Sequence, residues 1–191
     1  LLAEGDNQLQ ARRLDNRQGE VRALNGNLNA TLSEDVDNSR AGEQGSVMSA
    51  AGKLTINASA LNNQGTRGVG THEKLPTQGV LGGEIALNLP RLNNEQGGVY
   101  SQGDLQMKSV TQLSNRNGIL YSGKRAELGN ENTTTPVTVD NQGGVIEAQG
   151  LTLRRVRFGE SAYGELRAYD SAKMEIDGDV AIGQGDVWAF N

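Results

Sequence analysis

Apolar and polar residues alternate along this chain in short stretches, and most of these stretches end at a glycine or an asparagine. The segment from Val99 to Met107, VYSQGDLQM, is typical of the whole. An alternation with a period of two residues predicts β-strands, because successive side chains of a strand point to opposite faces. No stretch of helical length carries apolar residues at helical spacing, and the frequent glycines would destabilise a helix. We therefore predict an all-β chain.

A phrase made of leucine or valine, one variable residue and asparagine recurs along the chain. Its six copies begin at Leu14, Val36, Leu61, Leu92, Leu113 and Val139. Neighbouring copies lie between 21 and 31 residues apart, and each is followed by glycine and further alternating stretches. A sandwich of antiparallel hairpins would need turn signals between strands of matched length and no shared phrase. Regular recurrence instead predicts a parallel β-solenoid of about seven or more coils with three short strands each, stacked at about 4.8 Å.

The asparagine of the phrase has a predicted place in such a solenoid. We expect the six asparagines to form a column at one corner, where each amide can donate to one neighbouring coil and accept from the other. Asparagine also tolerates the left-handed conformation of a sharp bend, and we expect the corner glycines to supply positive φ angles. The alternative is that each asparagine is a turn residue without a ladder. The predicted column comprises Asn16, Asn38, Asn63, Asn94, Asn115 and Asn141.

Two coils are longer than the others. The third carries residues 66–79, which include the only histidine, His72, and the fifth carries residues 129–138. Insertions in a repeat protein form surface loops, where recognition is often located, although surface loops also tolerate length variation without any function. His72 is therefore a candidate binding residue.

The pattern changes after the sixth asparagine. We divide the chain into residues 1–155, with regular repeats, and residues 156–191, a continued β-solenoid with an altered coil pattern. Most of the few aromatic residues lie in the second region, among them Tyr163, Tyr169 and Trp188. These three are candidates for a sugar-stacking surface, although aromatic residues at such positions also form exposed ladders or pack against an end coil.

The composition limits the possible chemistry. The net charge is −5 with acids and bases interspersed, so we predict no nucleic-acid partner, and without cysteine no disulfide or thiol site is available. We predict no cofactor and no metal site, because a lone histidine cannot hold a metal ion unaided. Asp15, Asp37 and Asp140 fall in one predicted column without a facing acid, although Asp15 and Asp37 could raise each other's pKa. We therefore predict that the chain is not an enzyme.

The units LDNRQGEVRALNGNLNATL and VDNQGGVIEAQGLTLR resemble the repeats of the filamentous haemagglutinin family. The resemblance extends over residues 5–155. This family comprises large bacterial exoproteins of two-partner secretion systems, including adhesins and stick-like carriers of contact-dependent growth-inhibition toxins. The resemblance implies a right-handed parallel β-helix, export through an outer-membrane two-partner secretion transporter, and a location that is secreted or on the outer cell surface.

These observations lead to three expected functions. We favour a structural rod segment of a large secreted surface protein that supports adhesion or toxin presentation. The alternative is a segment that binds a receptor or glycan of a host or neighbouring cell, and a polysaccharide lyase is less favoured than either. The chain begins Leu-Leu and is interpreted as a fragment. Because the end coils of a fragment carry unpaired strand edges, we also expect end-to-end self-association.

Overall fold

The computed structural model describes residues 1–43, 45–68, 76–129, 134–159 and 164–178, together with the backbone of residues 186–189. The described residues contain strands and no helix, and all strand pairs are parallel members of one sheet. The sheet is wound into a β-solenoid of about 7 turns. The predicted all-β parallel solenoid is therefore confirmed.

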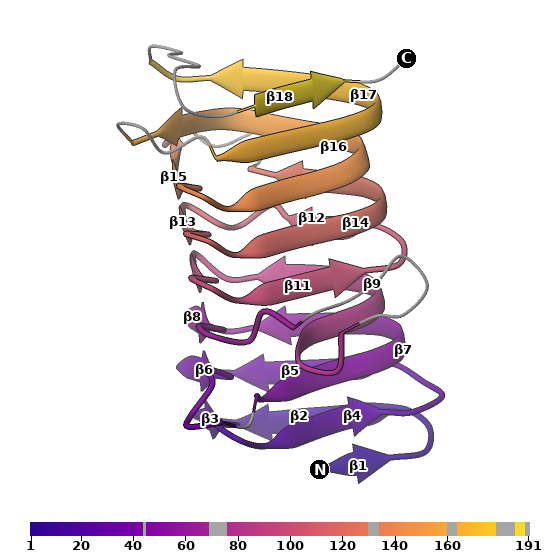
Figure 1. Ribbon diagram of the computed structural model, residues 1–191. Helices are drawn as coiled ribbons and strands as arrows, with labels where there is room; N and C mark the ends of the chain where they lie inside the picture. The colour runs from indigo at the N-terminus through magenta and orange to yellow at the C-terminus, as the bar shows by residue number, and fades with distance from the viewer. Residues whose placement is uncertain (44, 69–75, 130–133, 160–163, 179–185, 190–191) are drawn as a thin grey trace.

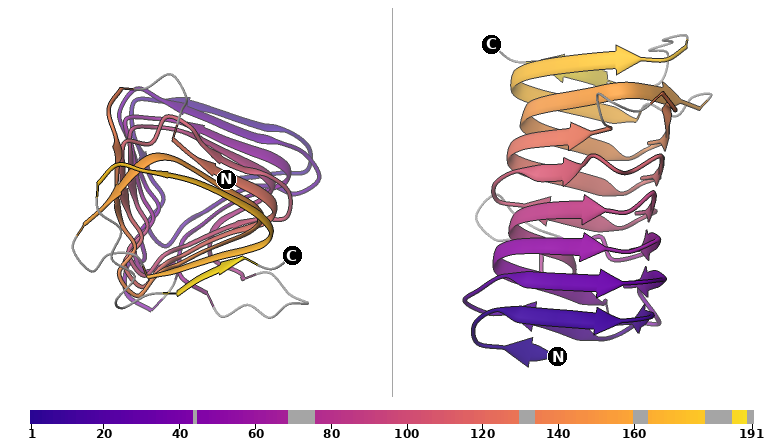
Figure 2. Two further views of the ribbon diagram at one scale, coloured as in Figure 1. Left: turned by 90° about the horizontal axis from the view of Figure 1, so that it is seen from above. Right: turned by 180° about the vertical axis from the view of Figure 1, so that it is seen from behind.

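The chain rises from the N-terminus at the bottom of Figure 1, crosses the front from left to right and returns behind from right to left. This sense of rotation makes the solenoid right-handed. Seen along its axis, the coils trace a triangle (Figure 2, left). We call the three sides the first, second and third face, in the order in which each coil forms them.

Short strands make up part of each face. The first face contains β1 (Leu2–Ala3), β4 (Glu20–Ala23), β11 (Gly98–Ser101) and β18 (Asp186–Ala189). The second face contains β2 (Asn7–Ala11), β5 (Leu28–Leu32) and β12 (Leu105–Met107). The third face contains β3 (Leu14–Asp15), β6 (Asp35–Asp37), β8 (Ala60–Asn62), β10 (Arg91–Asn93), β13 (Gln112–Ser114) and β15 (Val137–Asp140).

Five longer strands continue from the first face around a corner into the second. They are β7 (Val47–Asn57), β9 (Gly79–Asn88), β14 (Ile119–Leu128), β16 (Val145–Phe158) and β17 (Glu165–Ile176), of which the last two extend further onto the third face. Their pairings shift register at that corner, for example between Ser122 and Arg125 of β14. The predicted three faces per coil are therefore present. In these five coils, however, a bulged corner joins two strands that the sequence pattern separated.

The core is a stack of matching apolar side chains. On the third face the leucine or valine of the repeated phrase points inward, and Leu61, Leu92 and Leu113 lie in register on consecutive coils. On the first face Val80, Val99, Leu120 and Ile146 are stacked in the same way. Because most third-face strands contribute one inward residue, the core is narrow and medium-sized aliphatic side chains fill it.

The coils beyond residue 155 continue the parallel pairing. Strand β17 pairs with β16 from Glu165 to Ile176, and β18 pairs with β17 on the first face. The side chains of residues 169–175 are exposed, in contrast to the alternately buried ones of β16. On the second face, the side chains of β17 are therefore exposed to solvent.

Candidate functional site

Six buried asparagines form a continuous ladder at the corner between the third face and the first. Each follows a third-face strand, and the most exposed of them, Asn16, shows only 5% of its surface. In the first five, the side-chain Nδ2 donates to the Oδ1 of the next asparagine along the chain. The bonds are Asn16 to Asn38 at 2.7 Å, Asn38 to Asn63 at 2.8 Å, Asn63 to Asn94 at 2.8 Å, Asn94 to Asn115 at 2.7 Å and Asn115 to Asn141 at 2.6 Å.

Each ladder asparagine also bonds to the backbone of the next coil. The Nδ2 of Asn94 donates to the carbonyl oxygen of Ile119 at 3.1 Å, and its backbone N–H donates to that of Ser114 at 2.7 Å. Asn16 makes the equivalent side-chain bond to Val47 at 3.0 Å. Only a carboxamide has the donors and the acceptor to do all of this, because an aspartate has no N–H and an apolar side chain has neither group.

The ladder asparagines themselves do not have positive φ angles. Positive φ falls two residues later, at Gln18 (58°), Gln96 (50°) and Asn117 (51°), and at the matching glycines Gly65 and Gly143. The prediction that the column asparagines adopt the left-handed conformation is therefore wrong. Their amides are fixed by bonds to two coils. The main chain bends two residues later instead.

A glycine three residues after the asparagine is required by close approach. A Cβ added at Gly97 or Gly144 would lie 2.5 Å from the Oδ1 of the asparagine in its own coil, and one at Gly118 would lie 2.6 Å away. It would come closer still to the carbonyl oxygen of the asparagine one coil earlier. These glycines do not have positive φ, so the prediction that corner glycines supply positive φ is right for Gly65 and Gly143 but wrong here.

Two coils lack this glycine, and both leave the regular path at this point. Ala41 and Thr66 take its place, and the next first-face strand begins only at Val47 and Gly79, respectively. In the coils with glycine that strand begins at the following residue. A Cβ at this position would collide with the ladder, so the main chain makes a detour instead.

A buried hydroxyl group completes the hydrogen bonding of each detour. Thr66 Oγ1 donates to the carbonyl oxygen of Asn63 at 2.8 Å, a role that the backbone N–H of Gly97 fills for Asn94 at 2.9 Å. In the other detour Ser46 Oγ donates to the carbonyl oxygen of Ser39 at 2.7 Å. Both hydroxyl residues are fully buried, so the polar groups of the corner stay paired without the glycine.

The residue before five of the six ladder asparagines forms a turn on the outside of the corner. At this position the side-chain Oδ1 accepts from the backbone N–H two residues later, at between 3.1 and 3.4 Å. The acceptors are Asp15, Asp37, Asn62, Asn93 and Asp140. Aspartate and asparagine both supply this oxygen, which explains why the position varies between them. These carboxylates have a structural role and do not face a second acid across a cleft.

Arg17 determines the protonation of the first aspartate in this column. Its guanidinium donates to Asp15 through Nε at 2.9 Å and Nη2 at 2.6 Å, and its Nε lies 3.7 Å from Asp37 Oδ2. These hydrogen bonds lower the pKa of Asp15 from 3.8 to about 2. The expectation that Asp15 and Asp37 raise each other's pKa is therefore wrong for Asp15, because the arginine lies between the two carboxylates.

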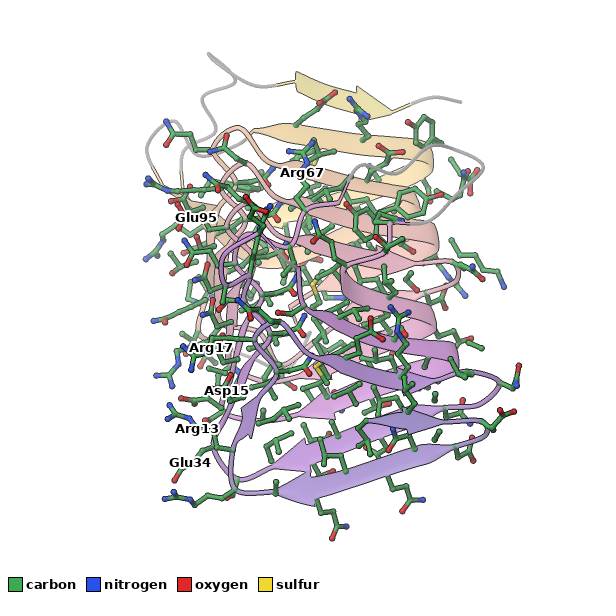
Figure 3. All side chains as sticks on the ribbon, turned by 60° about the horizontal axis from the view of Figure 1, so that its bottom comes forward. Arg13, Asp15, Arg17, Glu34, Arg67 and Glu95 are labelled. Atoms are coloured by element: carbon green, nitrogen blue, oxygen red, sulfur yellow. The ribbon has the colours of Figure 1, made fainter. Side chains whose placement is uncertain are left out.

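Ion pairs between neighbouring coils run along the outside of the third face and its corners. Arg13 pairs with Asp35 and Arg12 with Glu34, both at 3.3 Å. Figure 3 shows Arg13, Asp15, Arg17 and Glu34 gathered on one side of the rod. These side chains are largely exposed, so each pair contributes little to stability and mainly favours one alignment of adjacent coils.

The four candidate binding residues do not form a site in the described part of the structure. His72 and Tyr163 lie outside the described residues, as does the side chain of Trp188, whose backbone pairs with Arg167 in the first face. Tyr169 is 38% exposed at the corner between the first and second faces. Its hydroxyl donates to Glu147 Oε1 at 3.2 Å.

Glu147 belongs to a small polar cluster on the first face. It is 9% exposed and accepts from Arg167 Nη1 at 2.9 Å, while Arg167 Nε donates to Glu165 at 2.6 Å. These bonds, first of all the one to Glu165, raise the pKa of Arg167. Because the carboxylates and the guanidinium satisfy one another, the cluster holds two coils together and Tyr169 is part of it.

The third-coil insertion contacts two later coils through its described ends. Arg67 Nη1 donates to the carbonyl oxygen of Asn117 at 2.7 Å, and the Tyr100 hydroxyl donates to that of Gly68 at 3.4 Å. Tyr100 is 6% exposed on the outer side of the first face, and burial raises its pKa to about 12. Gly68, at the described start of the insertion, thus lies against an aromatic side chain on the outer side of the first face.

A second row of asparagines was not predicted. On the outside of the second face, Asn88 Nδ2 donates to Asn57 Oδ1 at 2.9 Å, and Asn57 Nδ2 donates to Asn29 Oδ1 at 3.3 Å. This row runs opposite in direction to the buried ladder. The available signal was that all three asparagines follow an inward apolar residue in a second-face strand.

The described residues contain no group of three or more histidine, cysteine, aspartate or glutamate side chains that could hold a metal ion. No helix long and apolar enough to cross a membrane occurs among them. Comparisons of the chain with protein-family models, with curated proteins and with solved structures found no match in any of the three.

Proposed function

We propose that the chain is a structural rod segment of a large secreted bacterial surface protein, which supports adhesion or the presentation of a toxin at a distance from the cell. The observation that supports this proposal is the unbroken asparagine ladder from Asn16 to Asn141, which joins successive coils through a buried column. A column of bonds that crosses five consecutive coil boundaries resists bending and shear along its length. This is the property that a spacer needs and a ligand pocket does not.

In this proposal the parent protein leaves the cell through an outer-membrane two-partner secretion transporter and remains secreted or on the outer cell surface. Folding outside the cell suits a parallel solenoid, because each coil can stack on the previous one as it emerges. The chain contains no cysteine, so disulfide formation in the periplasm cannot obstruct export.

An export experiment tests the rod function. The chain is placed between a two-partner secretion export domain and a C-terminal epitope, in a bacterium that carries the matching transporter. We expect surface staining of the epitope and a narrow distribution of energy transfer from a fluorophore on it to a membrane dye, because about seven stacked coils fix one span of about 30–35 Å. Replacement of the chain by a flexible linker of equal residue number should broaden this distribution, because such a linker samples many distances around a root-mean-square span of about 70–80 Å. Intracellular retention of the fusion, or a distribution as broad as that of the linker, would refute the proposal.

The second candidate function is recognition of a receptor or glycan of a host or neighbouring cell. Tyr169 favours it, because its ring is exposed at a corner while its hydroxyl is held by Glu147. A glycan array with the wild-type chain and Tyr169→Ala tests this candidate, and binding that survives the substitution would exclude Tyr169 as its basis. A polysaccharide lyase is the least favoured function, and turnover of an acidic polysaccharide with Ca²⁺ would be needed to support it.

A further inference from the structure

The second face carries a strip of uncharged outward side chains over five consecutive coils. Apart from Lys53 and Glu84 at the corner with the first face, the outward side chains of this face on β2, β5, β7, β9 and β12 are amides, hydroxyls and one alanine. They are Gln8, Gln10, Asn29, Thr31, Thr55, Asn57, Ala86, Asn88 and Gln106. We call this set the amide–hydroxyl face. Figure 2 (right) shows the stacked second-face strands from their outer side.

The lack of charge is local to this part of the chain. Charged residues make up 21% of the sequence, and they return on the same face in later coils, where Glu127 and Lys173 occupy the column that contains Thr55. At the edge of the amide–hydroxyl face Lys53 and Glu84 pair in register at the corner with the first face. Charged side chains therefore border the uncharged surface at this corner and in the later coils.

Hydrogen bonds organise this face in advance of any ligand. Asn57 Nδ2 donates to both Asn29 Oδ1 and Thr31 Oγ1 at 3.3 Å, and both acceptors belong to uncharged side chains. Asn88 Nδ2 continues the row to Asn57 at 2.9 Å. Coils repeat about every 4.8 Å, and outward residues repeat about every 6.6–6.8 Å along a strand, so polar groups are presented on a regular grid. Side chains held in this way lose less entropy on binding.

We propose that the amide–hydroxyl face binds a neutral polysaccharide chain that lies flat across several coils. Hydroxyl groups of sugars both donate and accept, as do the amides and hydroxyls of this face. No ion must be stripped of water on either side, which removes the largest cost of burying a polar surface. Each contact is weak, so a polymer that spans many of them is favoured over a single sugar. This proposal is independent of the rod function and of Tyr169.

The same features disfavour other partners. A nucleic acid needs clustered cations, and this face has none among its outward residues. A membrane or an apolar protein surface needs large apolar side chains, whereas the only apolar residue here is Ala86, which is 6% exposed.

Co-sedimentation with an insoluble neutral glucan tests the proposal. Wild-type chain is mixed with amorphous cellulose, and in parallel with a calcium pectate gel, at low and high salt. We expect retention on the neutral polymer that does not change with salt, and none on the acidic one. Thr55→Lys should reduce retention at least ~10-fold, because it places a charge in the centre of the contact. Asn29→Asp keeps the size of the side chain and the oxygen that accepts from Asn57, and it should also reduce retention.

Thr152→Lys is the matched control, since Thr152 lies in the same outward column beyond the uncharged coils and has a similar intermediate exposure. It should bind like wild type, with circular dichroism confirming that all variants are folded. No retention of wild type, retention that falls with salt, or equal loss in Thr152→Lys would overturn the proposal. A wild-type dimer in sedimentation that Thr55→Lys abolishes would assign the face to a second copy of the chain and would overturn it too.

Discussion

The side-chain amide of Asn94 donates to Oδ1 of Asn115 at 2.7 Å, across the boundary between two coils that lie 21 residues apart in the sequence. Asn94 Oδ1 in turn accepts from Asn63 at 2.8 Å, so its amide is bonded on both sides. Asn16, at the N-terminal end of the described ladder, donates to Asn38 and receives no ladder bond from another described asparagine. The same residue type therefore has different surroundings at the middle and at the end of the column.

Alanine at these two positions should have unequal effects. Asn94→Ala removes two ladder bonds and leaves polar groups of two coils without partners in a fully buried corner, whereas Asn16→Ala removes one. We expect Asn94→Ala to lower the free energy of unfolding by ~1–3 kcal/mol more than Asn16→Ala, the cost of one further buried unpaired group. Denaturant unfolding measures the difference. Equal or reversed losses would contradict the ladder as a source of stability.

The glycine after the ladder asparagine gives a second prediction. Gly118→Ala places a Cβ against Asn115 Oδ1, which the ladder holds in place, and should destabilise the chain by at least ~2 kcal/mol. Gly5→Ala is the control, because an added Cβ there meets no atom within 4 Å. Thermal unfolding of both variants compares them. A Gly118→Ala variant as stable as Gly5→Ala would show that this corner can expand.

Tyr100 should ionise at a higher pH than an ordinary tyrosine. Its pKa is raised from 10.0 to about 12 because its side chain is buried on the first face. A raised pKa means that the folded state retains the proton, so this contribution to stability is complete below pH 10 and is lost as the pH rises through about 12. Absorbance titration of tyrosinate in wild type and Tyr100→Phe measures the value. A titration in Tyr100→Phe that still contains this late step would assign it to another tyrosine.

Asp15 gives the corresponding prediction in acid. Its pKa is lowered from 3.8 to about 2 by hydrogen bonds from Arg17, so its contribution is present above pH 3.8 and is lost as the pH falls through about 2. The pair is exposed, so added salt should weaken this effect. Carboxyl chemical shifts in NMR follow the titration directly. Arg17→Ala should return the pKa of Asp15 toward 3.8, and an unchanged value would contradict the arginine as the cause.

The two ends of the chain should associate head to tail. Leu1 and Leu2 are 62% and 61% exposed at one end, and Met174 is 36% exposed at the other. Because both ends carry strand edges of the same parallel sheet, the end of one copy can extend the sheet of the next. Sedimentation velocity should therefore show association that increases with concentration.

Two end variants distinguish this arrangement from a symmetric dimer. Leu2→Glu blocks one end and Met174→Glu the other, so each variant alone should stay monomeric while an equimolar mixture forms dimers through the two intact ends. Wild type that remains monomeric at all concentrations would mean that the ends are capped. Dimers formed by either variant alone would indicate a contact between like ends.

Much of the fold could be predicted because a parallel solenoid repeats its environment. Each coil places the same position against the same neighbours, so Leu61, Leu92 and Leu113 recur in the sequence for the same reason that they stack in the core. The buried column could be identified in the same way, since only the asparagine of the phrase occurs in all six copies. Function could not be derived in this manner, because regular stacking is compatible with a spacer and with a binding surface alike.

Period-two alternation and the recurring asparagine thus determined, from the sequence alone, that this chain winds into parallel coils in register. Tertiary structure decided the roles that depend on distances between coils. It placed the left-handed bend at Gln96 and not at Asn94. It showed that Gly97 is required because a side chain would collide with the ladder, and not because its φ is positive. It also put Arg17 between two carboxylates. The physical reason is that a periodic pattern specifies which residues meet on adjacent coils, whereas contacts of a few ångströms between atoms follow only from how closely those coils approach.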